Sequence, residues 1–246
     1  MIFRSNLTAP DLTPHFKHLV SRPLPHSFGH DVPSDWGDMA DDDPVFGLYK
    51  KCGMWTHDEA AILHRCVERA PGSWVDIGAH TGWTTAHIGT AAKDVIAVEP
   101  MFSVAEFWTR FKENQIEGQK IGEFHGRSDQ YFRSAMGRVE KAGFVIDGDH
   151  EPGKPLEDAK GACAKSDLVI FHDFIGLPVR EAVQYLMGRG FHCRVYFTPH
   201  MIAVCWRGDF NAPYHIADRE LPDLKARCPE FPWERCETSG LEGAMS

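Results

Sequence analysis

The chain has 246 residues, of which 43% are hydrophobic, and its formal net charge is -9 at pH 7. This size and apolar content suit one α/β domain with extra terminal segments and exclude wholesale disorder, while the acidic balance and the lack of a Lys/Arg-rich run disfavour a nucleic-acid partner. There is no run of about 18 apolar residues and no signal-peptide layout, and the seven cysteines are scattered without a CxxC motif, so we expect a cytoplasmic protein with reduced thiols and no membrane contact.

The first 45 residues differ from the remainder of the chain. They are rich in proline and weakly periodic, so we expect residues 1–45 to form an arm or lid. Beyond them, some segments repeat apolar residues at helical spacing and others are short apolar runs, which predicts helices alternating with buried strands. The expected helices span residues 57–70, 84–92, 102–115, 129–141, 154–164 and 178–188. The expected strands span residues 73–78, 95–99, 122–126, 143–147, 167–173, 191–197 and 201–206.

This alternation predicts an α/β fold of the Rossmann-like, doubly wound type. We expect a mostly parallel seven-stranded sheet with helices on both faces, in which the last two strands form a C-terminal antiparallel hairpin. Residues 46–208 would form this domain, and residues 209–246 would be an extension that packs on it. Such sheets bind ligands outside the carboxyl ends of their strands, where the strand order reverses. Residues that follow the strands are therefore the candidates for a functional site.

The loop after the first strand contains two glycines and an acid, and reads Asp76-Ile77-Gly78-Ala79-His80-Thr81-Gly82. Gly78 and Gly82 allow a tight turn and a close approach of the backbone to a ligand. A dinucleotide enzyme would show GxGxxG here, because the helix N-terminus must receive a pyrophosphate. Asp76 instead places a negative charge ahead of the first glycine, which favours a cationic ligand such as S-adenosylmethionine over a diphosphate.

Two further polar residues follow the second and third strands. Glu99 ends the second strand, where a carboxylate can accept hydrogen bonds from both ribose hydroxyls, and Ser128 lies where an adenine amino group would be met. The loop together with Glu99 resembles the first two motifs of class I S-adenosylmethionine-dependent methyltransferases, although the family pattern has glycine where this chain has His80. The resemblance implies a methyltransferase with cofactor contacts at Asp76, Gly78, His80, Gly82, Glu99, Ser128 and Asp147.

Acids and histidines follow the fourth and fifth strands, as Asp147-Gly148-Asp149-His150 and as His172-Asp173. Because adjacent parallel strands end at the same edge of a sheet, we expect these side chains about 5 to 10 Å apart. Carboxylates gathered there repel one another unless a cation or a proton joins them, and oxygen ligands suit Mg²⁺. Such an ion would lower the pKa of a substrate hydroxyl, and His150 would accept its proton.

Residues 145–173 resemble small-molecule O-methyltransferases of the macrocin O-methyltransferase type, and more distantly catechol and caffeoyl-CoA O-methyltransferases. The resemblance implies Asp147 and Asp173 as ligands of a divalent metal, and His150, acting with Asp147, as the catalytic base. The substrate would be a hydroxylated small molecule, such as a sugar or a natural product.

One position departs from this pattern, since the third metal ligand of the family falls on Phe174. If a metal binds, Asp149, His172 or water would complete its shell. If none binds, Asp147 contacts the methionine end of the cofactor, His172 is a structural strand-end histidine, and methyl transfer proceeds largely by proximity and alignment.

The sequence therefore leaves three functional hypotheses open. The leading hypothesis is a methyltransferase acting on a hydroxyl group, with an ordered arm and tail that would favour a homodimer. The second is a catalytically inactive Rossmann-like binding protein, suggested by His80 and Phe174. The third is a nicotinamide-dependent oxidoreductase, which the absence of GxGxxG disfavours.

Overall fold

The computed structural model describes residues 7–10, 12, 15, 55, 57–196, 198, 201–215, 226 and 228–236. The predicted arm, residues 1–45, lies almost entirely outside these residues, and so does much of the predicted extension, residues 209–246. The predicted boundaries of both segments stay predictions.

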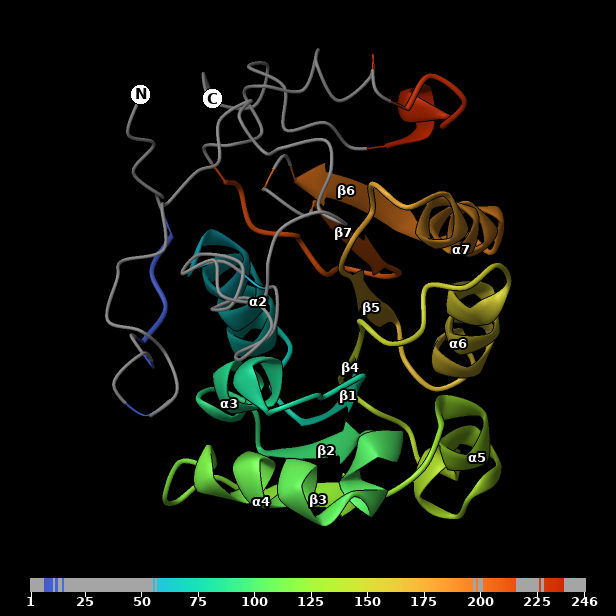
Figure 1. Ribbon diagram of the computed structural model, residues 1–246. Helices are drawn as coiled ribbons and strands as arrows, with labels where there is room; N and C mark the ends of the chain where they lie inside the picture. The colour runs from blue at the N-terminus through green and yellow to red at the C-terminus, as the bar shows by residue number, and fades with distance from the viewer. Residues whose placement is uncertain are drawn as a thin grey trace, which may run out of the picture.

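Strands and helices alternate along the described chain, as the sequence predicts (Figure 1). The strands are β1 Ser73–Ile77, β2 Asp94–Val98, β3 Ile121–Phe124, β4 Gly143–Ile146, β5 Leu168–Phe171, β6 His192–Tyr196 and β7 Ile202–Trp206. The α-helices are α2 His57–Arg69, α3 Trp83–Gly89, α4 Ala105–Glu113, α5 Ser128–Arg133, α6 Lys154–Cys163 and α7 Leu177–Gly188. Short 3₁₀ helices lie at η2 Pro100–Ser103, η3 Met136–Arg138 and η5 Trp233–Arg235.

The helix expected over residues 129–141 is the main difference in secondary structure. Helix α5 ends at Arg133, and the chain turns into η3. The turn folds the backbone of Gly137 back onto α5, so that a Cβ atom at this position would lie 2.2 Å from the carbonyl oxygen of Tyr131. A glycine at this position therefore permits a close return of the chain that one continuous helix would prevent.

The seven strands form one sheet in the order β3-β2-β1-β4-β5-β7-β6. Strands β1 to β5 are parallel to one another, whereas β7 lies antiparallel between β5 and β6. This confirms the predicted fold class, including the antiparallel C-terminal pair. The strand order reverses between β1 and β4, which is the place where such sheets bind ligands.

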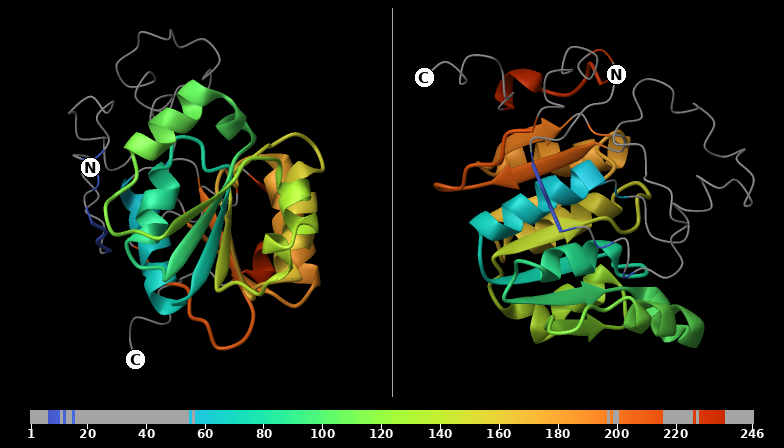
Figure 2. Two further views of the ribbon diagram at one scale, coloured as in Figure 1. Left: turned by 90° about the horizontal axis from the view of Figure 1, so that it is seen from below. Right: turned by 90° about the vertical axis from the view of Figure 1, so that its left-hand side faces the viewer.

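Helices cover both faces of the sheet (Figure 2). Successive side chains along each strand point to opposite faces of the sheet, so the strands contribute to two separate apolar cores. Val75 of β1 belongs to the core beneath α6 and α7, whereas Trp74 belongs to the core beneath α2 and α3. Val145 of β4 and Ile170 of β5 also belong to the core beneath α2 and α3. Asp147 and His172 each lie two residues beyond Val145 and Ile170, just past the ends of β4 and β5. The alternation along the strands therefore assigns them to the same face of the sheet.

The described parts of both terminal segments pack against these cores. Leu12 is buried against the core beneath α2, and Phe231 and Trp233 are buried in the core beneath α7. The C-terminal segment is also held by Arg180 of α7, whose Nε atom lies 2.7 Å from Oε1 of Glu230. Among the described residues, we find no helix with the length and apolar character needed to cross a membrane.

Candidate active site

Asp76 lies near the carboxyl end of β1 and is completely buried. Its Oδ2 atom accepts a hydrogen bond of 2.5 Å from the Thr85 hydroxyl of α3, whereas no described group donates to Oδ1. Burial raises the pKa of Asp76 to about 7, opposed by the Thr85 hydrogen bond and reinforced by the charges of Asp147 and Glu99. In the cofactor-free chain, the negative charge that the sequence places ahead of the first glycine therefore depends on pH.

The loop after β1 uses three residues with positive φ angles. Gly78 has φ 87°, and a Cβ atom there would lie 2.3 Å from the carbonyl oxygen of Asp147, so only glycine lets the loop pass the end of β4. His80 has φ 46°, a left-handed conformation in which histidine is enriched, and its ring lies edge-on to Phe107 with centroids 4.8 Å apart. Gly82, with φ 93°, precedes α3. Histidine at the middle glycine position of the family thus still permits a tight turn.

Glu99 anchors this loop to the end of β2. Its Oε2 atom accepts a hydrogen bond from the backbone N–H of His80 at 3.0 Å, and Oε1 accepts one from Met101 at 2.9 Å. Each carboxylate oxygen has a second lone pair, so ribose hydroxyls can still be bound. Ser128 begins α5 beside Asp158 of α6, an acid whose pKa burial raises to about 6 and Ser128 lowers, and its contact with the adenine amino group stays a prediction.

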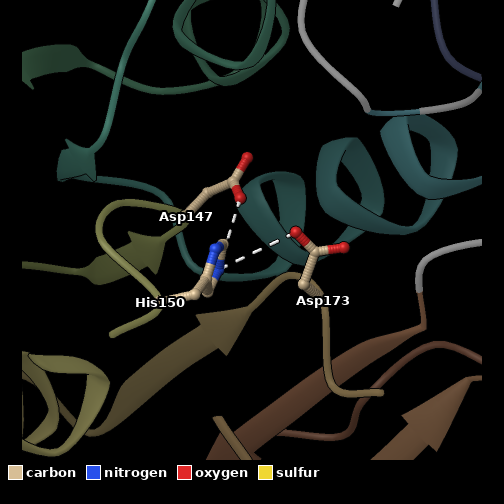
Figure 3. Close-up of side chains that lie close together, drawn as sticks. All are labelled: Asp147, His150 and Asp173. Atoms are coloured by element: carbon tan, nitrogen blue, oxygen red, sulfur yellow. Dashed lines mark ion pairs between the residues drawn. The ribbon is translucent and has the colours of Figure 1, made fainter. Parts of the chain in front are cut away.

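Asp147, His150 and Asp173 lie together beyond the ends of β4 and β5 (Figure 3). Nε2 of His150 is 3.9 Å from Oδ1 of Asp147 and 3.8 Å from Oδ2 of Asp173. Asp173 has φ 54°, a conformation that is uncommon outside glycine and clusters at functional sites. The structure does not bring Asp149 into this group, since its Oδ2 atom faces Nη2 of Arg127 at 3.6 Å.

This group offers the donor set of a cation site. One ligand atom from each of its three residues lies within 4.8 Å of the others. Two carboxylates suit Mg²⁺, and the imidazole extends the choice to Mn²⁺, Fe²⁺ or Zn²⁺. The donor chemistry therefore fits a divalent cation, with His150 in the place for which the sequence left Asp149, His172 or water.

Phe174, where the family has a third metal ligand, belongs to the core. Its side chain is fully buried and lies edge-on to Phe231, with ring centroids 4.9 Å apart and an interplanar angle of 87°. A second edge contact joins it to Trp233 at 6.0 Å. The residue after Asp173 therefore serves to pack the C-terminal segment, which gives the departure from the family pattern a structural reason.

The structure places near Asp147 three further side chains to which the sequence assigns no catalytic role: Trp55, Glu59 and His172. His172 is fully buried, with Nδ1 3.1 Å from Oδ1 of Asp147 and Nε2 3.5 Å from Oε2 of Glu59. Burial alone would lower the pKa of His172, but the carboxylates of Asp147 and Asp173 raise it well above 6.5. Trp55 stacks on this ring with centroids 4.5 Å apart.

The sequence does carry a signal for this group. Glu59 occupies the same helical stripe as Ile62, Leu63 and Cys66, at positions i, i+3, i+4 and i+7, and all four are buried. A carboxylate on the apolar face of an amphipathic helix needs a buried partner, because an isolated charge there is too costly. The Thr56–Glu59 spacing also fits a capping box, but Thr56 lies outside the described residues.

No family model matches this chain, and no curated protein sequence does either. Among solved structures, it is similar to a candidate caffeoyl-CoA O-methyltransferase from Staphylococcus aureus, with a TM-score of 0.55, 12% identity, and coverage of 66% of this chain and 89% of the other. It is also similar to the O-methyltransferase TomG from Streptomyces achromogenes, solved with S-adenosylmethionine, with a TM-score of 0.52, 16% identity, and coverage of 71% and 90%.

A third similar structure is the precorrin-6y C5,15-methyltransferase from Geobacter metallireducens, with a TM-score of 0.50, 13% identity, and coverage of 65% of this chain and 92% of the other. At these identities the likeness shows the fold alone. The chain has the α/β fold of class I S-adenosylmethionine-dependent methyltransferases. The macrocin-type subclass is a narrower assignment, and it rests on the sequence resemblance.

Proposed function

We propose that this protein is an S-adenosylmethionine-dependent methyltransferase that methylates a hydroxyl group of a small molecule. The observation that carries the proposal is the arrangement at the switch point of the sheet. The glycine turn after β1, the acid at the end of β2 and the acid after β4 meet at one edge of the sheet. In this fold that edge binds the ligand, and the chain has no GxGxxG motif for a dinucleotide.

This edge of the sheet offers complementary groups for each part of the cofactor. The free lone pairs of Glu99 would accept the ribose hydroxyls. Gly78 lets the loop lie against the end of β4, and the ammonium and sulfonium charges of a methionine portion bound there would favour ionisation of Asp76. A cationic ligand without phosphate suits this acidic loop better than a nucleotide does.

The acceptor hydroxyl would meet the transferred methyl group beside Asp147. Methyl transfer from a sulfonium requires close, in-line placement of the acceptor oxygen, and such alignment supplies much of the rate. Asp147 would bind the hydroxyl, and the imidazole of His150, which is partly exposed, would accept its proton. A divalent cation held by Asp147, His150 and Asp173 would lower the pKa of that hydroxyl; His150 would then be a ligand rather than the base, and the hydroxyl proton would pass to solvent.

Ligand-dependent stabilisation tests the cofactor assignment. S-adenosylhomocysteine should raise the melting temperature and NADH should not, because only a ligand that binds the folded state stabilises it. The reverse result would reject the proposal. Methyl transfer should then be detected with at least one acceptor from a panel of catechols, phenols and glycosides, and should be lost in Asp147→Ala. Binding without turnover would favour the alternative, a catalytically inactive Rossmann-like binding protein.

A further inference from the structure

The Asp147 carboxylate is held from two sides by buried side chains. Nδ1 of His172 lies 3.1 Å from Oδ1 of Asp147 and donates a hydrogen bond to it. The indole N–H of Trp55 donates a hydrogen bond of 2.6 Å to the other oxygen, Oδ2. Both oxygens thus have a fixed donor, which restricts rotation of the carboxylate about its χ2 angle.

The two donors are themselves fixed. The Trp55 ring lies nearly parallel to the His172 ring, with centroids 4.5 Å apart and an interplanar angle of 15°. On the side of His172 away from Asp147, Oε2 of Glu59 lies 3.5 Å from Nε2, within ion-pair distance. Glu59 and His172 are both fully buried, and Trp55 is 2% exposed, so none of these contacts depends on a mobile surface side chain.

Stability alone does not explain this arrangement. Burying a carboxylate and an imidazole costs desolvation energy that their attraction only partly offsets, and apolar residues of similar volume are often as stabilising. Catalytic groups, by contrast, must be held within about 0.5 Å of their working position by partners whose own rotamers are locked. Glu59 and His172 form such a buried pair, and His172 contacts Asp147 at the edge of the sheet where the reaction is expected.

We propose that Trp55, Glu59 and His172 are positioning residues that hold the Asp147 carboxylate in one orientation toward the acceptor. Trp55 and helix α2 would then be part of the active site, although both lie outside the two methyltransferase motifs. The inference rests on the proposed function for the role of Asp147, but the arrangement itself can be tested independently.

Two conservative variants separate positioning from folding. Trp55→Phe keeps a ring on His172 and removes the donor to Asp147, whereas Glu59→Gln keeps the size of the side chain and removes its charge. Trp74→Phe is the matched control, because Trp74 is equally buried and donates only to the carbonyl oxygen of Ala70. Crystal structures of each protein would report the orientation of Asp147. Isothermal titration with S-adenosylhomocysteine and steady-state kinetics with an active acceptor from the panel of catechols, phenols and glycosides would report function.

In Trp55→Phe and Glu59→Gln we expect Asp147 to adopt a second orientation. We also expect kcat to fall about 10- to 100-fold, the usual effect of removing a residue that orients a functional group, while the affinity for S-adenosylhomocysteine stays unchanged. Trp74→Phe should keep kcat and a single Asp147 orientation. An unmoved Asp147 carboxylate, or a reoriented one with wild-type kcat, would overturn the inference. Failure of the wild-type protein to bind S-adenosylhomocysteine would instead refute the proposed function, and the crystallographic comparison would still decide the arrangement.

Discussion

Replacing Asp76 by Asn should change how the stability of the protein depends on pH. Asparagine keeps the shape of the side chain and an oxygen that can accept the Thr85 hydrogen bond, but it does not titrate. In the wild-type chain, burial raises the pKa of Asp76 from 3.8 to about 7. Between these values the folded chain holds a proton that the unfolded chain has released, so the free energy of unfolding falls as pH rises.

The size of this effect follows from the two pKa values. Between pH 5 and pH 8, an acid with a folded pKa of about 7 and an unfolded pKa of 3.8 loses about 2.5 kcal/mol of its contribution to stability. For a chain of this length that corresponds to about 5 to 10 °C in melting temperature. In Asp76→Asn this part of the pH dependence should vanish, so the variant should gain stability relative to wild type as the pH is raised.

Thermal melts of both proteins from pH 5 to pH 8 would measure this difference. Thr84→Val is a suitable control, because Thr84 is a buried neighbour on α3 that does not titrate, and its loss should shift the curve without changing its slope. Parallel curves for wild type and Asp76→Asn would refute the reasoning, since they would show that Asp76 is ionised in the folded chain at all these pH values.

Three further outcomes are expected. Gly78→Ala should destabilise the protein by at least about 2 kcal/mol, seen as a lower melting temperature, because of its positive φ and the contact of the new Cβ with Asp147; a variant as stable as wild type would contradict the loop geometry. Glu99→Ala should weaken S-adenosylhomocysteine binding about 10- to 100-fold by calorimetry, and unchanged affinity would remove Glu99 from the cofactor site. Treatment with EDTA should lower methyl transfer, and Mg²⁺ or Mn²⁺ should restore it; full activity of metal-free protein would reject the cation site.

The order of the elements could be predicted from the sequence because it depends on local patterns. Buried parallel strands are short apolar runs, and the helices between them repeat at 3.6 residues, so nearly every element was found within a few positions. The exception, the segment after Arg133, depends on the close packing of Gly137 against α5, which no local periodicity records. The same holds for Phe174, whose role in packing the C-terminal segment depends on residues far along the chain.

The candidate site could be predicted only in part, for a related reason. Asp147, His150 and Asp173 follow strands that are adjacent in a parallel sheet, so their meeting follows from topology. The contact of Trp55 with Asp147 joins positions 92 residues apart and depends on how α2 packs on the sheet. The carboxylate of Glu59 on the apolar face of α2 indicates that it has a buried partner, but the sequence does not identify that partner. Which of Asp149 and His150 turns toward Asp147 depends on the loop conformation after β4.

A crystal structure of the protein with S-adenosylhomocysteine would test the central claim most directly. The account predicts that the ribose hydroxyls bond the Glu99 carboxylate, and that the homocysteine portion lies along the glycine turn beside Asp147. An adenosyl group bound elsewhere, or side chains filling the crevice between the ends of β1 and β4, would contradict it.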